Sequence, residues 1–176
     1  MAYIPLDDRL PGMRALLAYR PEISSPLLEL MQVVMRSNEG LSIGEREMIA
    51  TYVSALNDCY NCHHIHGEIA QCFFEDRPNL LEQIKNDYSS APISERLKSI
   101  LNIAGTVQKG GKWVGSEQIN AAKDLGVSDL EIHDTVLIAA MFCFFNRYID
   151  GLGVVSNDTP ESLKSRAKIM AEQGYH

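Results

Sequence analysis

The sequence predicts an all-α fold for the whole chain, residues 1–176, arranged as a single domain. Three observations lead to this prediction. Apolar residues recur with helical spacing in successive segments, residues typical of helix ends separate these segments, and alternating strand patterns are nearly absent. No low-complexity linker divides the chain, and 45% hydrophobic with 22% charged residues is ordinary for a soluble globular domain.

The helices are expected, in order, at residues 24–40, 41–58, 59–74, 93–111, 116–126 and 128–148, with a final exposed helix opened by Thr159 and Pro160. In the first of them, Ser25 is a candidate N-cap, Pro26 would take the first helical position and Gly40 would stop the helix. Asn57 and Asp58 are expected to end the second helix, and Asp58 can cap the third.

Two of these helices resemble each other in sequence. Both open with a predicted Ser-x-x-Glu capping box, at Ser42–Glu45 and at Ser128–Glu131. Residues 41–67 also match residues 125–151 without gaps at an offset of 84 residues, although the two boxes are out of step by two. The identical pairs are Leu41/Leu125, Glu47/Glu131, Thr51/Thr135, Ala55/Ala139, Cys59/Cys143, Ile65/Ile149 and Gly67/Gly151. We interpret the match as an internal pseudo-repeat of helix pairs.

Charge and composition argue against several classes of protein. A net charge of −7 and a pI near 5.2 argue against a nucleic-acid partner, because no basic stripe is present to neutralise phosphates. The first residues, MAYIPLDDRL, do not resemble a signal peptide. The longest apolar run, residues 136–145, is too short to span a membrane. We therefore expect a cytoplasmic protein with no membrane partner.

The segment NDCYNCHHIHGE, residues 57–68, contains the most distinctive chemistry. It can be interpreted as a C-x-x-C-H haem-attachment string, as a zinc site of thiols and imidazoles, or as a redox-active dithiol. Haem attachment needs export in most organisms, and no export signal is visible. Four cysteines are too few for a disulfide scaffold, so a close pair in a reducing compartment favours catalysis or metal binding.

The relative positions of Cys59, Cys62 and His66 favour the interpretation as a redox-active dithiol. Cys59, Cys62 and His66 share one face of a helix, because they are separated by three and four positions. With Asp58 as the cap, Cys59 would be the first helical residue, where free backbone N–H groups favour thiolate over thiol. His66 can accept and return a proton, and Glu47 on the preceding helix is the best candidate to orient it.

The pattern Glu47-x11-Cys59-x2-Cys62-x3-His66 resembles the signature of the alkylhydroperoxidase D (AhpD-like) branch of the carboxymuconolactone decarboxylase superfamily. The segment FFNRYIDGLGV, residues 144–154, looks like the closing motif of its peroxidase-related subgroup. The resemblance covers residues 21–154. It implies an all-helical fold and a homo-oligomer, either a dimer or a trimer of dimers.

The resemblance also implies an activity, the reduction of hydroperoxides by the dithiol. By similarity, Cys62 is the cysteine that attacks the peroxide, and Cys59 is the more exposed cysteine that resolves the product as a disulfide. His66 and Glu47 would form the proton relay. The expected partners are a hydroperoxide substrate and an external dithiol reductant, either a lipoyl-bearing or a thioredoxin-like protein. No cofactor and no metal are expected.

Two other functions stay open from the residues alone. One is a decarboxylase-like lactone chemistry, as elsewhere in the superfamily, which needs no dithiol. The other is a non-enzymatic, zinc-binding or redox-sensing helical oligomer.

Some polar and thiol side chains depart from the pattern or fall outside it. Asn61 stands where the subgroup usually has an aromatic residue, and His63 and His64 are expected to face solvent or a subunit interface. Cys72 and Cys143 are expected to pack as small hydrophobic side chains.

Overall fold

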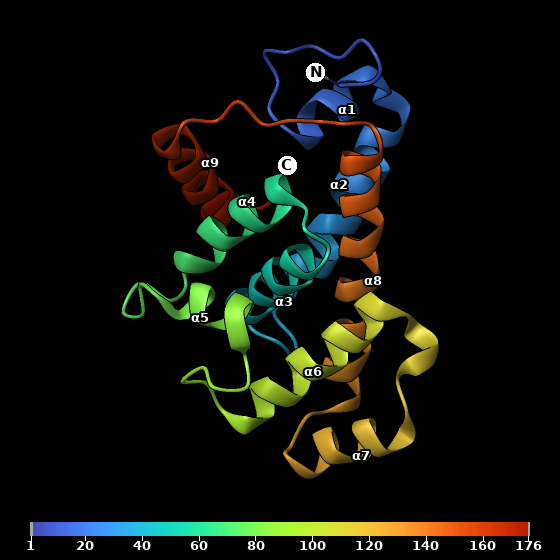
Figure 1. Ribbon diagram of the computed structural model, residues 1–176, viewed down its shortest axis with the longest axis vertical. Coiled ribbons are helices and arrows are strands. Elements are labelled where there is room, and N and C mark those ends of the chain that lie inside the picture. The colour runs from blue at the N-terminus through green and yellow to red at the C-terminus, as the bar shows by residue number, and fades with distance from the viewer. Residues whose placement is uncertain (1, 176) are drawn as a thin grey trace.

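The computed structural model describes residues 2–175, and all of its regular structure within that range is helical (Figure 1). The elements are α1 (Met13–Tyr19), α2 (Pro21–Met35), α3 (Ile43–Leu56), α4 (Tyr60–Gln71), α5 (Leu80–Asp87), α6 (Glu95–Lys109), the 3₁₀ turn η1 (Gly111–Trp113), α7 (Ser116–Asp124), α8 (Asp129–Gly151) and α9 (Pro160–Gln173). The predicted all-α fold is therefore confirmed. No helix among the described residues is long and apolar enough to cross a membrane.

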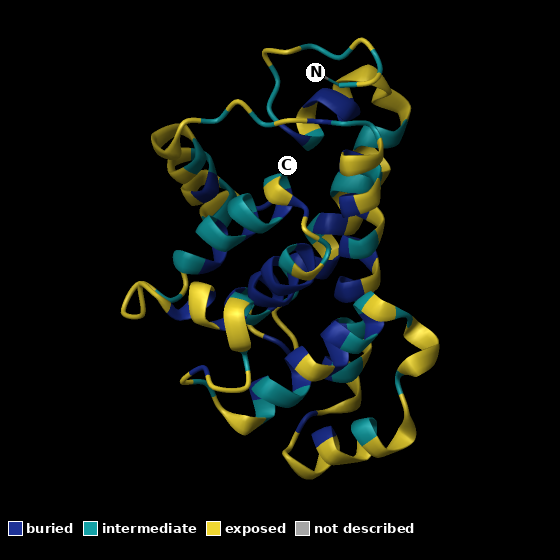
Figure 2. Ribbon diagram, in the orientation of Figure 1, coloured by how far each residue is buried: buried dark blue, intermediate teal, exposed yellow. Residues whose placement is uncertain are grey.

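Helix α3 is the centre of the fold. It packs against α4, α5, α6 and α8, and every residue from 46 to 54 is buried, as the dark blue segment in Figure 2 shows. Figure 1 shows α6 and α7 at one end of the molecule and α1 at the other, while α9 lies beside α4. Because α3 is covered on all sides, its few polar residues must find partners within the protein.

The apolar core has two parts. The larger cluster joins α2, α3, α6 and α8 and contains the methionines Met31, Met35 and Met48. The smaller cluster lies where α4 begins and α8 ends, and it consists of Leu16, Cys59, Cys62, Ile149 and Val154. Both cysteines of the C-x-x-C segment therefore lie in a small second core, between the start of α4 and the end of α8.

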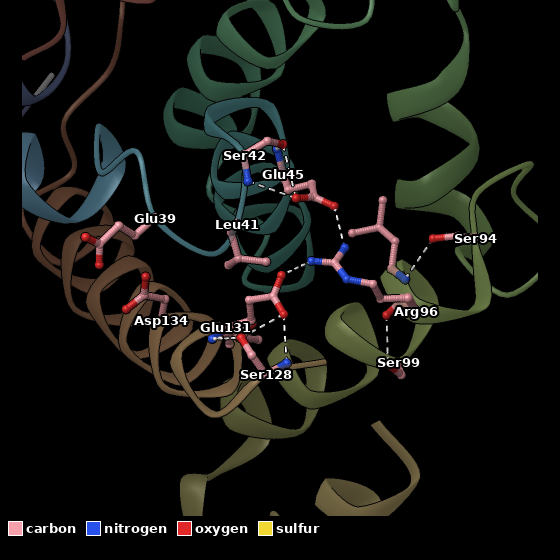
Figure 3. Close-up of polar contacts among 12 residues, drawn as sticks. Glu39, Leu41, Ser42, Glu45, Ser94, Arg96, Ser99, Ser128, Glu131 and Asp134 are labelled. Atoms are coloured by element: carbon pink, nitrogen blue, oxygen red, sulfur yellow. Dashed lines mark hydrogen bonds and ion pairs between the residues drawn. The ribbon is translucent and has the colours of Figure 1, made fainter. Parts of the chain in front are cut away.

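Both predicted capping boxes are present. In each, the serine side chain accepts from the backbone N–H of the glutamate, and the glutamate accepts from the backbone N–H of the serine; the pairs are Ser42–Glu45 and Ser128–Glu131. Arg96 from α6 lies between them and forms ion pairs with both glutamates (Figure 3). One guanidinium thus joins the starts of α3 and α8.

The start of α2 differs from its prediction. The helix begins at Pro21, with proline at its first position, so Ser25 and Pro26 lie inside it. Pro21 takes the first helical position, where its missing N–H costs no helical hydrogen bond. The helix ends at Met35, and Gly40, with φ +68°, forms the turn that leads into α3. Helices α1 and α5 were not predicted.

The helix predicted for residues 128–148 is confirmed as α8, so the second copy of the pseudo-repeat is one continuous helix where the first copy is a helix pair. The chain breaks between α3 and α4 at Asn57 and Asp58, but α8 runs without interruption through the positions that match them, Met141 and Phe142. These two side chains are buried and apolar, so they favour a continuous buried helix over a turn. The similarity is retained only within the helices: Thr51 and Thr135 each donate to the carbonyl of the glutamate four residues earlier.

Candidate active site

Helix α4 begins one residue later than the sequence predicts. Asp58 adopts φ +57°, a left-handed conformation that turns the chain between α3 and α4, and it is therefore not the cap. Cys59 takes the N-cap position, and its carbonyl accepts from the N–H of His63 at 3.1 Å. Cys62 is consequently the third residue of α4, within the first turn, where unpaired backbone N–H groups favour a negative charge.

The two thiols are both free and both buried. The prediction that Cys59 is the more exposed is wrong for this chain, because Cys59 is 0% and Cys62 4% exposed. The reason is the turn at Asp58, which places Cys59 against Leu16 and Ile149 in the smaller core. A hydrogen bond with Cys62 is the largest cause that raises the pKa of the Cys59 thiol, and burial is the second. Cys59 therefore stays protonated to a higher pH than an ordinary thiol.

Glu47 lies at the centre of a buried polar cluster. Its Oε2 atom is 2.7 Å from Nδ1 of His66 on α4, and its Oε1 atom is 2.6 Å from Nη1 of Arg36, just past α2. The phenol of Tyr175 donates to the same Oε1 atom at 2.6 Å. Glu47 is fully buried, and its three partners supply the hydrogen bonds that a carboxylate in such a place requires.

The partners of Glu47 also control its charge. Burial raises the pKa of the Glu47 carboxyl, but His66, Arg36 and Tyr175 outweigh burial, and the pKa is lowered overall. Nδ1 of His66 lies 2.7 Å from this carboxylate and is engaged by it. Nε2 is therefore the nitrogen through which the imidazole can exchange a proton with another group.

A cavity of about 900 Å³ lies beside this cluster, bounded by α1, α2, α4, α8 and α9. Cys62, His66 and Tyr175 line it, together with apolar side chains such as Met31 and Phe142. Cys59 is not among the residues that line it. A molecule in this cavity can therefore reach Cys62 and His66, whereas Cys59 is outside the lining.

Asn61, the departure from the subgroup pattern, has a structural explanation. Its Nδ2 donates to the carbonyl of Val154 at 2.7 Å, and its Oδ1 accepts from the N–H of Ser156 at 2.8 Å. These two bonds hold the segment between α8 and α9 against the first turn of α4. An aromatic side chain at this position could not make this pair of hydrogen bonds.

The remaining predicted side chains lie around the site. His63 and His64 are partly buried rather than fully solvent-facing, and they pack beside Tyr60. Burial and the charge of His64 lower the pKa of His63 to about 4. Cys72 and Cys143 are partly buried. Among residues 2–175, no group of three or more His, Cys, Asp or Glu side chains is arranged to hold a metal ion.

Sequence reasoning found Glu47 and His66 but missed Arg36 and Tyr175. The structure brings Glu47 and His66 together as predicted; His66 lines the cavity, and Glu47 lies buried beside it without lining the cavity itself. Arg36 precedes Glu47 by eleven residues across a turn, and an arginine at such a distance from a glutamate is a weak sequence signal for an ion pair. Tyr175 is 128 residues from Glu47, and no pattern in the sequence connects them.

Comparisons with known proteins give a consistent result for the fold. No family model and no curated protein matches the chain. A solved structure of an alkylhydroperoxidase AhpD core, an uncharacterized peroxidase-related protein from Ralstonia eutropha JMP134, matches with a TM-score of 0.78 and 31% identity, over 85% of this chain and 78% of that chain. An uncharacterized peroxidase-related protein from Silicibacter sp. TM1040 matches with a TM-score of 0.76 and 25% identity, over 81% of this chain and 74% of that chain.

Proposed function

This chain belongs to the AhpD-like family of peroxidase-related proteins, and from that premise we propose that it is a dithiol peroxidase that reduces hydroperoxides. The observation that carries the proposal is the arrangement around one cavity. Cys62, in the first turn of α4, and His66, held by the buried Glu47, line the same cavity, which is large enough for an organic hydroperoxide.

In the first step, His66 accepts the proton of Cys62 on Nε2, and the Cys62 thiolate attacks the outer oxygen of the hydroperoxide. The O–O bond breaks, the sulfur is oxidised to a sulfenic acid, and the leaving alkoxide takes the proton back from His66 to become an alcohol. Glu47 stabilises the imidazolium that exists between the two proton transfers.

In the second step, Cys59 attacks the sulfenic sulfur of Cys62, a disulfide forms and water leaves. The hydrogen bond with Cys62, and next burial, raise the pKa of the Cys59 thiol. Cys59 also does not line the cavity, so the hydroperoxide meets Cys62 first and Cys59 acts only in the second step.

The oxidised enzyme then needs an external dithiol. We propose a lipoyl-bearing or thioredoxin-like protein as reductant, because thiol–disulfide exchange with a second dithiol returns both cysteines to the thiol state. The homo-oligomer also remains a proposal. Exposed apolar side chains on neighbouring helices support it, namely Leu30 and Val33 on α2 and Phe144 on α8.

The experiment that tests this function measures consumption of an organic hydroperoxide with dihydrolipoamide as reductant. We expect many turnovers for each protein molecule and one dithiol oxidised for each peroxide reduced. The matched control is Cys72→Ser, a thiol outside the cavity lining, which should leave the rate unchanged. Peroxide consumption no faster than in the absence of protein would contradict the proposal, and activity that survives loss of both Cys59 and Cys62 would favour chemistry without a dithiol.

A further inference from the structure

The last described residue of the chain is brought into the candidate active site by a tight turn. Helix α9 ends at Gln173, and Gly174 follows with φ +84°, a left-handed conformation that favours glycine. The next N–H, that of Tyr175, donates to Oε1 of Gln32 on α2 at 2.8 Å. A Cβ atom on Gly174 would lie only 2.2 Å from the same Gln32 oxygen. The turn and the anchor therefore fix where the tyrosine points.

The side chain of Tyr175 is enclosed by the polar cluster. It is 5% exposed, its hydroxyl oxygen is 2.6 Å from Oε1 of Glu47 and 3.3 Å from Nδ1 of His66, and the guanidinium of Arg36 lies 4.5 Å from the ring centre. These contacts come from α2, α3 and α4. Among the hydrogen bonds of the described residues, Tyr175 supplies the only hydroxyl that contacts the Glu47 carboxylate, whereas the Thr51 hydroxyl donates to the Glu47 backbone carbonyl.

The proton of this phenol can be assigned. Burial and the neighbouring Glu47 charge raise the pKa of Tyr175 well above 10, so the hydroxyl is protonated and donates. Glu47 is the acceptor, because its pKa is lowered and it is ionised. The other carboxylate oxygen, Oε2, forms a hydrogen bond with Nδ1 of His66 at 2.7 Å. The carboxylate is thereby held from both sides in one orientation.

We propose that Tyr175 is a positioning residue for the proton relay. It holds the Glu47 carboxylate, and through it His66, in the orientation that lets the imidazole accept the Cys62 proton. This inference rests on the proposed peroxidase function for its effect on rate, but the contact with Glu47 itself does not. Its consequence is that the C-terminal turn completes the relay, because nothing in α2, α3 or α4 replaces the phenol hydroxyl.

The test is Tyr175→Phe, which removes the hydroxyl and keeps the ring. Loss of one hydrogen bond to an ionised group should raise the titration midpoint of Glu47, followed by its carboxyl-carbon resonance, by about one pH unit. The maximal rate of Cys62 oxidation by peroxide should fall by about 10-fold, with the half-saturating peroxide concentration almost unchanged, because the cavity keeps its shape. The matched control is Tyr52→Phe on α3, a buried tyrosine beside Tyr88 and away from Glu47, which should change neither value.

A Glu47 midpoint equal to that of the unmodified protein would overturn the inference, and so would a raised midpoint with an unchanged rate. The two proposals fail in different ways. If the unmodified protein does not react with any hydroperoxide, the proposed function fails, and the Glu47 midpoint, which needs no peroxide, then decides by itself whether Tyr175 holds the carboxylate.

Discussion

Cys62→Ser is expected to abolish hydroperoxide reduction while leaving the fold intact. Serine is close to cysteine in size and fits the first turn of α4, but its hydroxyl is not ionised near neutral pH and forms no sulfenic acid. Cys62 is the sulfur that lines the cavity, so Cys59 cannot take its place. The measurement is the rate of peroxide consumption with dihydrolipoamide, together with circular dichroism to show that the helices are retained.

The matched variant Cys59→Ser should separate the two steps. Cys62 and His66 are untouched, so one equivalent of hydroperoxide should still react, but the sulfenic acid on Cys62 should accumulate because no second thiol resolves it. A sulfenic-acid-specific reagent such as dimedone, followed by mass spectrometry, should label Cys62 only. Turnover in Cys62→Ser, or dimedone labelling of Cys62→Ser at Cys59, would reverse the roles that we assign.

Glu47→Gln is expected to lower both activity and stability. Without the carboxylate, the imidazolium that forms during the reaction loses its counter-charge, and we expect the rate of Cys62 oxidation to fall by about 100-fold or more. The same change leaves the guanidinium of Arg36, 8% exposed, without its buried partner, which should cost about 3 kcal/mol in the free energy of unfolding. Urea denaturation at pH 7 measures the second effect.

The contribution of Glu47 to stability should also depend on pH. Its pKa is lowered from an ordinary value of 4.5, so the unfolded chain binds the proton first as the pH falls. Its contribution is therefore fully present above pH 4.5 and is lost as the pH falls through the lower value of the folded protein. Glu47→Gln should lack this part of the acid dependence.

A double variant distinguishes the two roles of Glu47. Arg36→Met combined with Glu47→Gln removes the unpaired cation, and most of the lost stability should return because the buried charge is gone. The rate should stay low, since the carboxylate that serves His66 is still absent. Recovery of the rate together with stability would show that Glu47 has only a structural role.

The part of the site that could be predicted depends on local sequence spacing. Cys62 and His66 lie one turn apart on one helix, and Glu47 is on the helix directly before it, so helical periodicity and a short turn are enough to bring them together. The capping boxes of α3 and α8 were predictable for the same reason, because each involves residues three apart.

The part that could not be predicted depends on tertiary packing. Tyr175 reaches Glu47 only because α9 packs against α4 and the chain turns at Gly174. The burial of Cys59 depends on Leu16 from α1, a helix that was not predicted. The positive φ of Asp58 moved the start of α4 by one residue, and a non-glycine residue in that conformation has only a weak sequence signal. Each of these features needs contacts between residues that are distant in sequence.

The most direct test of the central claim is a mass spectrum of the reduced protein after one equivalent of hydroperoxide. The protein has four free cysteines. The account predicts that the peptide with Cys59 and Cys62 becomes lighter by the mass of two hydrogens through an internal disulfide, while Cys72 and Cys143 remain thiols. Unchanged thiols, or a disulfide that involves Cys72 or Cys143, would contradict it.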